Sequence, residues 1–292
     1  FAIRLSIAPL VLRWLRLVPR KPVILAPRGE FTQGALGIKP LKKKIYISLS
    51  KSIGLLRQLI WHASNDAEAE DIKRVVDRDN GIHIAADLPA QGAVTRVQQV
   101  HAPGQLRVCF LSRIARMKNL DFALRAPASA RGNVDFDIYG PLEDADYWNE
   151  CQGLMRLLPP NVHAHYRGSV AHRDVRDVIS KYELLFVPSR GEGFGHVFIE
   201  ALSSGVPILV SDQTPWRNLS AAGVGRDLPL SDVEQFSKAI EEFAAASAAE
   251  YEQLRKTCVN YALQVINDAS HVDQNKVILR HALAQGSGAR NR

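Results

Sequence analysis

Two glutamates, Glu192 and Glu200, lie in the stretch GEGFGHVFIEALSSGVP at residues 191–207, with seven residues between them. Carboxylates accept hydrogen bonds from hydroxyl groups, so the pair could hold a sugar and a ribose. Gly193 and Gly195 lie between the two acids and allow the backbone to approach a ligand closely. The simpler alternative is a capped helix decorated with solvated acidic residues.

The surrounding sequence favours a ligand site. Residues 184–212, LLFVPSRGEGFGHVFIEALSSGVPILVSD, follow the order strand, glycine-rich loop, helix, glycine and strand. The N–H groups and the dipole at the start of such a helix suit a phosphate. We therefore expect residues 195–197 to bind a phosphate, and Glu200, about one turn into the helix, to accept hydrogen bonds from a ribose.

A second group of residues could neutralise a diphosphate. In FLSRIARMKNL at residues 110–120, Arg113 and Lys118 flank a loop that follows a predicted strand. Two cations there would stabilise a diphosphate as it becomes a leaving group. Arg116 is interpreted as a bystander, and Asn119 is predicted to cap the next helix.

The elements that must position these side chains alternate along the second half of the chain. Residues 106–230 contain six candidate strands with intervening helices, which predicts an α/β domain with a parallel sheet covered on both faces. Ligands of such a sheet bind beyond the carboxyl ends of the strands. The clearest strands are expected at 106–111, 134–140, 162–168, 184–187 and 207–211.

The first hundred residues show the same alternation more weakly, with about three strands. Strands are predicted at 22–26 and 59–64, and a basic helix within 41–58. A further helix at 65–76 should begin at Asn65, whose side chain is a good N-cap.

This pattern divides the chain into domains. Residues 1–100 are predicted to form a Rossmann-like domain that ends in a linker at 86–105, which is rich in Pro and Gly. Residues 101–265 should form a second Rossmann-like domain. Residues 266–292 are predicted to be a C-terminal helix with a disordered tail at 284–292.

The glutamate stretch resembles the glutamate-seven-residues-glutamate motif of the retaining family 4 glycosyltransferases. This resemblance extends over residues 22–282 and implies the GT-B fold, with two Rossmann-like domains and a cleft between them. It also implies a hexosyltransferase that uses a nucleotide diphosphate sugar, UDP- or GDP-linked, without a metal ion or other cofactor. A cytoplasmic enzyme of polysaccharide or glycoconjugate synthesis, with a glycan or lipid-linked acceptor, is the expected setting.

The resemblance also implies residue roles. Glu192, Arg113 and Lys118 would form the catalytic group, the two cations serving the pyrophosphate. The donor would be bound by the loop and the helix start, with Glu200 on the ribose. The implied donor-binding residues are Gly193, Phe194, Gly195, His196, Val197 and Glu200.

Four other positions are weaker candidates. The resemblance implies that Val170 lies near the nucleotide base and that Thr214 borders the diphosphate. In the first half, Arg28 stands where many relatives carry a histidine facing the cleft. His62 ends the next predicted strand, where a cleft role and a structural role are equally open.

Two motifs that suggest metal ions are interpreted as coincidental. Asp135 and Asp137 match the aspartate-x-aspartate motif of a different glycosyltransferase architecture, but they lie on a strand remote from the glutamate stretch. His163 and His165 share one face of a strand but lack further ligands at metal spacing. We expect catalysis without a metal.

Charge and cysteine content limit the possible partners. The net charge of +7 permits nucleic acid, an anionic membrane or phosphorylated small molecules, but no nucleic-acid-binding motif is present. The apolar N-terminal stretch 1–22 is broken by arginines and is not a transmembrane span. It is predicted to be a surface helix, with a basic amphipathic segment on a membrane as the alternative. Three widely spaced cysteines are typical of a reducing compartment.

The resemblance also implies several strands before residue 22, so the acceptor half is expected to be incomplete and the chain poorly active alone. A nucleotide-sugar-binding remnant, or an epimerase or phosphorylase on the same fold, remains an alternative.

Overall fold

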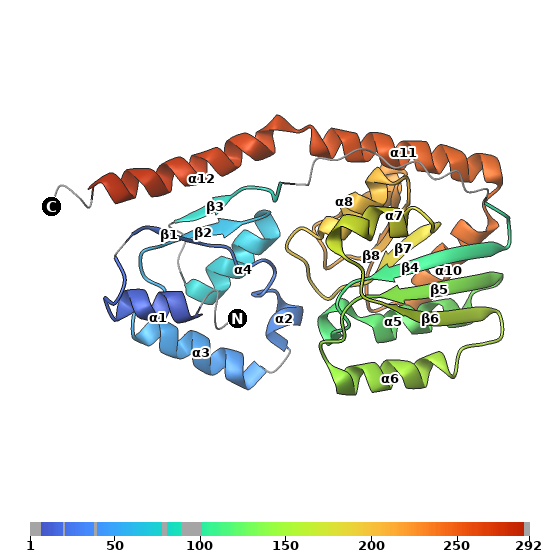
Figure 1. Cartoon of the computed structure of the whole chain (residues 1–292), viewed down its shortest axis with the longest axis horizontal. Coiled ribbons are helices and arrows are strands. Elements are labelled where there is room, and N and C mark those ends of the chain that lie inside the picture. Colours follow the sequence, from blue (N-terminus) through green and yellow to red (C-terminus); the bar gives the residue numbers. More distant parts are fainter. Residues whose placement is uncertain (1–6, 20, 38–39, 78–80, 89–100, 289–292) are drawn as a thin grey trace. The chain divides into compact units, whose positions relative to one another are not determined.

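The computed structural model describes residues 7–19, 21–37, 40–77, 81–88 and 101–288 (Figure 1). The chain divides into two compact units. Unit 1 comprises Phe1–Leu88, Gly191–Phe194 and Asp268–Arg292, and unit 2 comprises Pro89–Arg190 and Gly195–Asn267. Most of the predicted linker falls on residues 89–100, outside the described residues. Within the described part, no helix combines the length and the apolar character needed to cross a membrane.

Unit 2 contains a six-stranded parallel sheet with the strand order β6-β5-β4-β7-β8-β9. The interior strands β7 and β8 are buried along their whole length, as their unbroken apolar runs predict. The prediction of six strands in a parallel sheet is confirmed. The strands are β4 (Gln105–Leu111), β5 (Asn133–Tyr139), β6 (Val162–Gly168), β7 (Leu184–Val187), β8 (Ile208–Ser211) and β9 (Gly225–Leu228).

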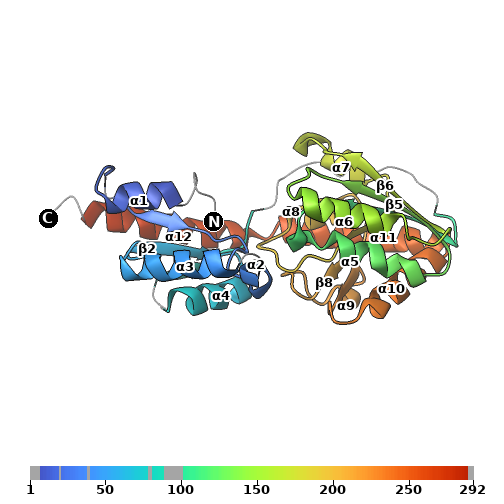
Figure 2. The same ribbon diagram turned by 90° about the horizontal axis from the view of Figure 1, so that it is seen from below.

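Helices cover both faces of this sheet, with α5 and α6 on one face and α7 and α8 on the other (Figures 1 and 2). Side-chain caps start several of them, including Asp144 on α6 and a reciprocal Ser247–Glu250 capping box on α11. The helices are α5 (Leu120–Arg125), α6 (Ala145–Met155), α7 (Val175–Ile179), α8 (His196–Ser203), α9 (Leu219–Ala222), α10 (Val233–Ala245) and α11 (Ala248–Ile266).

Unit 1 is built on a three-stranded parallel sheet in the order β1-β2-β3. The strands are β1 (Val23–Leu25), β2 (Leu59–Ala63) and β3 (Ile82–Ile84). The helices are α1 (Ala8–Trp14), α2 (Gln33–Gly37), α3 (Pro40–Ser52), α4 (Asp66–Val76) and α12 (Ala269–Gly288). The N-cap prediction for α4 is confirmed, since the side chain of Asn65 accepts a hydrogen bond from the backbone N–H of Glu68.

Strand β2 is the centre of unit 1, because both of its faces are buried. Leu59, Trp61 and Ala63 pack into the main core, which includes side chains of α1 and α4. Ile60 points to the opposite face and packs with Ala85 and with Ile278 of α12. The C-terminal helix therefore belongs to the core of unit 1. The predicted disordered tail is wrong for residues 284–288, which continue α12, while residues 289–292 lie outside the described residues.

Candidate functional site

The loops that follow β4 and β7 in unit 2 are tied together by Asn119. Its buried side chain donates from Nδ2 to the carbonyl oxygen of Pro188 (3.1 Å) and accepts from Nε of Arg190 (3.0 Å). The backbone N–H of Arg190 donates to the carbonyl oxygen of Met117 (2.8 Å). The prediction that Asn119 caps α5 is wrong, because the residue adopts a left-handed conformation (φ 61°) and its side chain makes these contacts instead.

Helix α8 begins immediately after Gly195, which is left-handed (φ 77°). A Cβ atom at this position would lie 2.5 Å from the ring of Phe198, so both the backbone conformation and the space require glycine. The helix begins with His196 and Val197, whose backbone N–H groups lie in its first turn, at its amino end. Together with the helix dipole, they present a positive end suited to phosphate.

Glu200 lies in the second turn of α8 and is 7% exposed. Among the residues that the structure describes, no donor makes a hydrogen bond to its carboxylate, and Nδ1 of the His172 imidazole lies 3.9 Å from Oε1. Burial raises the pKa of the Glu200 carboxyl, while His172 and Arg176 partly oppose the shift. The carboxylate is thus a poorly compensated acceptor, which hydroxyl donors of a ligand would satisfy.

Arg113 follows β4, and its Nη1 lies 2.9 Å from Oε2 of Glu143. Both side chains are exposed, so this ion pair is weak and can be exchanged for an anionic ligand. Lys118 is the last residue of a short 3-10 helix, Arg116–Lys118. Arg116 is bound to Glu150 of α6 and lies over the ring of Tyr147, 5.0 Å from its centroid. These contacts give Arg116 a structural role in unit 2.

The candidates Val170 and Thr214 also lie in unit 2. Val170 is half-buried in the segment after β6. Thr214 is buried, and its hydroxyl donates to the carbonyl oxygen of Ser211 (3.1 Å), which closes the turn after β8. The hydroxyl of Ser211 in turn donates to the carbonyl oxygen of Ser189, so the turn is held against the loop after β7.

The aspartate and histidine pairs form a ladder on one face of β5 and β6. Asp135 is in register with His163, and Asp137 with His165. Asp137 accepts hydrogen bonds from Arg167 (2.9 Å) and from the hydroxyl of Tyr182 (2.7 Å). In the described part of the chain, no group of three or more His, Cys, Asp or Glu side chains is arranged to hold a metal ion.

The middle of the glycine loop, residues 191–194, groups with unit 1. Within that unit the carbonyl oxygen of Gly193 accepts hydrogen bonds from Oγ of Ser64 (2.9 Å) and Nδ2 of Asn65 (3.1 Å). A Cβ atom at Gly193 would lie 3.2 Å from Cα of Arg28. The structure thus brings two of the predicted residues, Gly193 and Arg28, into backbone contact, and it places Glu192 and Phe194 beside Gly193 in the same loop.

Glu68 holds this arrangement together and was not predicted. Its buried carboxylate accepts hydrogen bonds from the backbone N–H groups of Gly29 (2.7 Å) and Ser64 (2.8 Å). It also lies 2.7 Å from Oγ of Ser64, whose single proton is shared between Glu68 and the carbonyl oxygen of Gly193. One side chain therefore fixes the loop after β1 and the end of β2. The only signal in the sequence is an acidic residue in the first turn of α4, which is usually a solvated position.

Arg28 and His62 have local partners in unit 1. Arg28 is left-handed (φ 54°) and forms an ion pair with the buried carboxylate of Asp87. His62 is buried, and its Nε2–H donates to the carbonyl oxygen of Ala85 (2.8 Å). Burial lowers the pKa of His62, and the nearby Arg28 adds to this effect. Of the two roles left open for His62, these contacts support the structural one.

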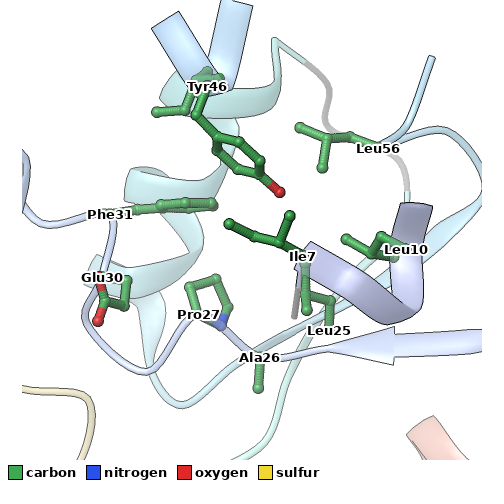
Figure 3. Close-up of a pocket in the computed structure, with 10 residues that line it drawn as sticks. Ile7, Leu10, Leu25, Ala26, Pro27, Glu30, Phe31, Tyr46 and Leu56 are labelled. Atoms are coloured by element: carbon green, nitrogen blue, oxygen red, sulfur yellow. The ribbon is translucent and has the colours of Figure 1, made fainter. Parts of the chain in front are cut away.

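Unit 1 also contains a small apolar cavity of about 60 Å³ (Figure 3). Leu10 of α1, Leu25 of β1 and Tyr46 of α3 point into it, together with Phe31. This volume is well below that of small-molecule sites. Glu30 is the acidic residue among its lining side chains.

Residues 94–265, more than half of the chain, match the family described as glycosyl transferases group 1. The chain belongs to this family. Among curated proteins, the GtfA subunit of a UDP-N-acetylglucosamine–peptide N-acetylglucosaminyltransferase from Streptococcus agalactiae is 26% identical over 167 residues. That match covers 53% of this chain and 31% of the relative, so the chain spans about a third of the length of this relative.

Two solved glycosyltransferase structures have a similar fold. Anabaena Alr3699/HepE, in complex with UDP and glucose, has a TM-score of 0.70 at 15% identity, with coverage of 95% of this chain and 76% of that chain. The pneumococcal O-GlcNAc transferase GtfA, in complex with UDP and GlcNAc, has a TM-score of 0.55 at 19% identity, with coverage of 77% and 46%. The predicted GT-B type fold is confirmed.

Proposed function

We propose that this group 1 glycosyltransferase transfers a hexosyl group from a uridine diphosphate sugar to an acceptor hydroxyl, with retention of configuration. The observation that carries the proposal is Glu200, a buried carboxylate in the second turn of α8 that lacks a hydrogen-bond donor among the described residues. The two hydroxyls of a ribose would supply the missing donors. The UDP bound in HepE and in GtfA supports uridine as the base.

The residues around Glu200 suit the rest of the donor. The start of α8 behind Gly195 would hold the distal phosphate, and Arg113 and Lys118 would neutralise the diphosphate as the bond to the sugar breaks. In this scheme Glu192, in the glycine loop, accepts hydrogen bonds from sugar hydroxyls. Retention is supported by the resemblance to the retaining family 4 enzymes, in which the leaving diphosphate helps to deprotonate the acceptor. We expect donor binding to need no metal ion.

The proposed acceptor is a glycan or a lipid-linked saccharide, and the proposed setting is polysaccharide or glycoconjugate synthesis in the cytoplasm. Support for this setting comes from the similar fold of WaaG, a glycosyltransferase involved in lipopolysaccharide biosynthesis, with a TM-score of 0.60 at 15% identity.

Calorimetric titration with UDP, GDP and ADP, each in excess chelator, tests the donor site. UDP should bind, and Glu200→Gln should weaken it about ten- to a hundredfold, which corresponds to the loss of charge-assisted hydrogen bonds. The control is Glu252→Gln, an exposed glutamate of α11. Unchanged UDP affinity in Glu200→Gln would contradict the proposed role.

Transfer itself is tested with labelled UDP-glucose and UDP-N-acetylglucosamine and a mixed glycan and glycolipid acceptor fraction, followed by NMR assignment of the new anomeric linkage. An α-linked product from an α-linked donor would support retention. Tight UDP-sugar binding without transfer to any acceptor would favour a binding protein, and conversion of the sugar nucleotide itself would favour an epimerase.

A further inference from the structure

Arg190 is an exposed cation at the same end of the unit 2 sheet as the proposed donor site. It is the third residue after β7, and β7 is a neighbour of β4 in the sheet. The loops after these two strands therefore lie at the carboxyl ends, where parallel sheets bind ligands. The proposed function uses Arg113 and Lys118 from the loop after β4 and leaves Arg190 without a role. An exposed arginine is usually just solvated, so what matters is how this side chain is held.

Asn119 fixes the side chain of Arg190. Nε of Arg190 donates to Oδ1 of Asn119 (3.0 Å), and Nδ2 of Asn119 donates to the carbonyl oxygen of Pro188 (3.1 Å). Asn119 is 1% exposed. Reversing its amide would set two donors against each other at Arg190 and two acceptors at Pro188. The amide therefore has one favourable orientation, and that orientation holds the Nε edge of the guanidinium.

The guanidinium is held beside the turn that contains Lys118. The backbone N–H of Arg190 donates to the carbonyl oxygen of Met117 (2.8 Å), and its side chain is bound to Asn119. The residues on either side of Lys118 thus both contact Arg190. Two cationic residues are gathered at one turn, and their mutual repulsion is relieved when an anion binds to both.

The charge of Arg190 has no acidic partner within the part of the chain that the structure describes. By contrast, Arg113 pairs with Glu143. Arg116 of the same loop pairs with Glu150. With Nε already bonded, the edge formed by Nη1 and Nη2 of Arg190 keeps two parallel N–H groups. This edge matches two oxygens of a phosphate, and a side chain that is fixed in advance loses less entropy on binding.

We infer that Arg190 binds the diphosphate of the nucleotide sugar and that Asn119 is its positioning residue. This role rests on the proposed donor site and adds a third cation to Arg113 and Lys118. Each phosphate of the donor carries negative charge, and the diphosphate gains more as its bond to the sugar breaks. A cation that is already in place stabilises this charge without reorganisation.

Two other interpretations of Arg190 predict different behaviour. If Arg190 only ties the loops after β4 and β7 together, its loss would disturb every ligand of the donor site to the same degree. If Arg190 binds an anionic group of the acceptor, UDP alone would not sense its loss. Uridine, which lacks phosphate, and UDP, which lacks an acceptor, therefore separate the three interpretations.

Titration of the full chain with UDP and with uridine tests the inference. Arg190→Gln removes the charge and keeps a polar side chain, and it should weaken UDP binding about tenfold, as expected for a charge-assisted hydrogen bond. Uridine should bind equally to the variant and to the unaltered chain in NMR titrations. The matched control is Arg131→Gln, which removes an exposed arginine just before β5, at the amino end of the same sheet. This control should bind UDP as the unaltered chain does.

Two further variants test the positioning by Asn119. Arg190→Lys keeps the charge but lacks the planar fork, so UDP should bind about threefold more weakly than to the unaltered chain. Asn119→Gly tolerates the left-handed backbone (φ 61°) and removes the amide. It should weaken UDP binding in the unaltered chain and add little to Arg190→Gln, because it acts through the guanidinium. Circular dichroism and thermal melting verify that all variants are folded.

Unchanged UDP affinity in Arg190→Gln would overturn the inference, and so would an equal loss of affinity for UDP and for uridine. An equal loss of UDP affinity in the Arg131→Gln control would also overturn it. If Glu200→Gln weakens UDP binding and Arg190→Gln does not, the proposed donor site stands and the role of Arg190 alone fails. If the unaltered chain binds neither UDP nor GDP, the proposed function fails and the role of Arg190 fails with it.

Discussion

Glu68 provides the sharpest test of how unit 1 holds the glycine loop. Its two carboxylate oxygens accept hydrogen bonds from the backbone N–H groups of Gly29 and Ser64, and they share the hydroxyl proton of Ser64 with the carbonyl oxygen of Gly193. Glu68→Ala would leave the two backbone donors without an acceptor, and all three residues are buried. A buried donor that loses its partner costs about 1–3 kcal/mol. For two donors, we therefore expect unit 1 to lose roughly 2–6 kcal/mol of its free energy of unfolding.

Glu68→Gln separates geometry from charge. The amide keeps one acceptor oxygen, so it can accept from the N–H of Gly29 or from that of Ser64. Its NH₂ group then faces the remaining N–H, which is left without an acceptor. The expected loss is intermediate, about 2–3 kcal/mol. The control is Glu70→Gln, an exposed residue of the same helix whose ion pair with Lys73 contributes little.

Hydrogen–deuterium exchange by mass spectrometry is the assay, because it reports on each unit separately. In both Glu68 variants, exchange should accelerate in peptides that contain Gly29, β2 and residues 191–194, since Ser64 donates to the carbonyl oxygen of Gly193. Peptides from β4 and β5 should exchange as in the unaltered chain. If Glu68→Ala changes exchange no more than Glu70→Gln does, the carboxylate does not hold this arrangement and the reasoning fails.

Three further predictions follow from the site. Because the pKa of Glu200 is raised above the ordinary carboxyl value of 4.5, the stability of the folded chain falls as the pH rises above 4.5. Glu200→Gln should therefore melt at a higher temperature than the unaltered chain at pH 7, and the difference should vanish in acid. A lower melting temperature of the variant at pH 7 would refute this. Because the pKa of His62 is lowered in the folded chain, the unfolded chain takes up a proton first as the pH falls below 6.5, so acid destabilises the fold. In urea titrations, the free energy of unfolding of His62→Gln should therefore depend less on pH than that of the unaltered chain. Glu143→Gln should release Arg113 and raise UDP affinity by up to about fivefold in calorimetry, since exposed pairs contribute about 0–1 kcal/mol; weaker binding would show that the pair positions Arg113.

The sequence predicted the sheet of unit 2 well because its strands are buried on both faces. Runs such as LLFV and PILV have no other stable arrangement in a chain whose helices alternate with them. Strand β3 of unit 1 was not located, because it is only three residues long and none of them is buried. The position of β3 is fixed by its pairing with β2, in which Trp61 is in register with Ile82 and Ala63 with Ile84. A local sequence pattern does not reveal such pairing.

The residues that the sequence misjudged are those whose side chains act over a long separation in the chain. Asn119 before a helix is typical of a cap, yet its contacts are with Pro188 and Arg190. Glu68 in a first helical turn is typical of a solvated acid, yet it binds the N–H of Gly29, thirty-nine residues away. In both cases the local preference is real, but burial beside an otherwise unpaired backbone group outweighs it.

Gly193 and Gly195 show how one sequence signal serves two purposes. Both read as loop glycines that let a ligand approach, but they belong to different units. Gly195 is left-handed and makes room for Phe198, so it sets where α8 begins in unit 2. At Gly193 there is no such backbone requirement, since its φ is not positive; glycine is favoured there because a Cβ would press on Arg28 of unit 1. The glycine loop therefore contributes a helix start to unit 2 and a backbone contact to unit 1. Glu192 lies on the unit 1 side of this division, and Glu200 on the unit 2 side. The two carboxylates that first suggested a single site therefore belong to different units.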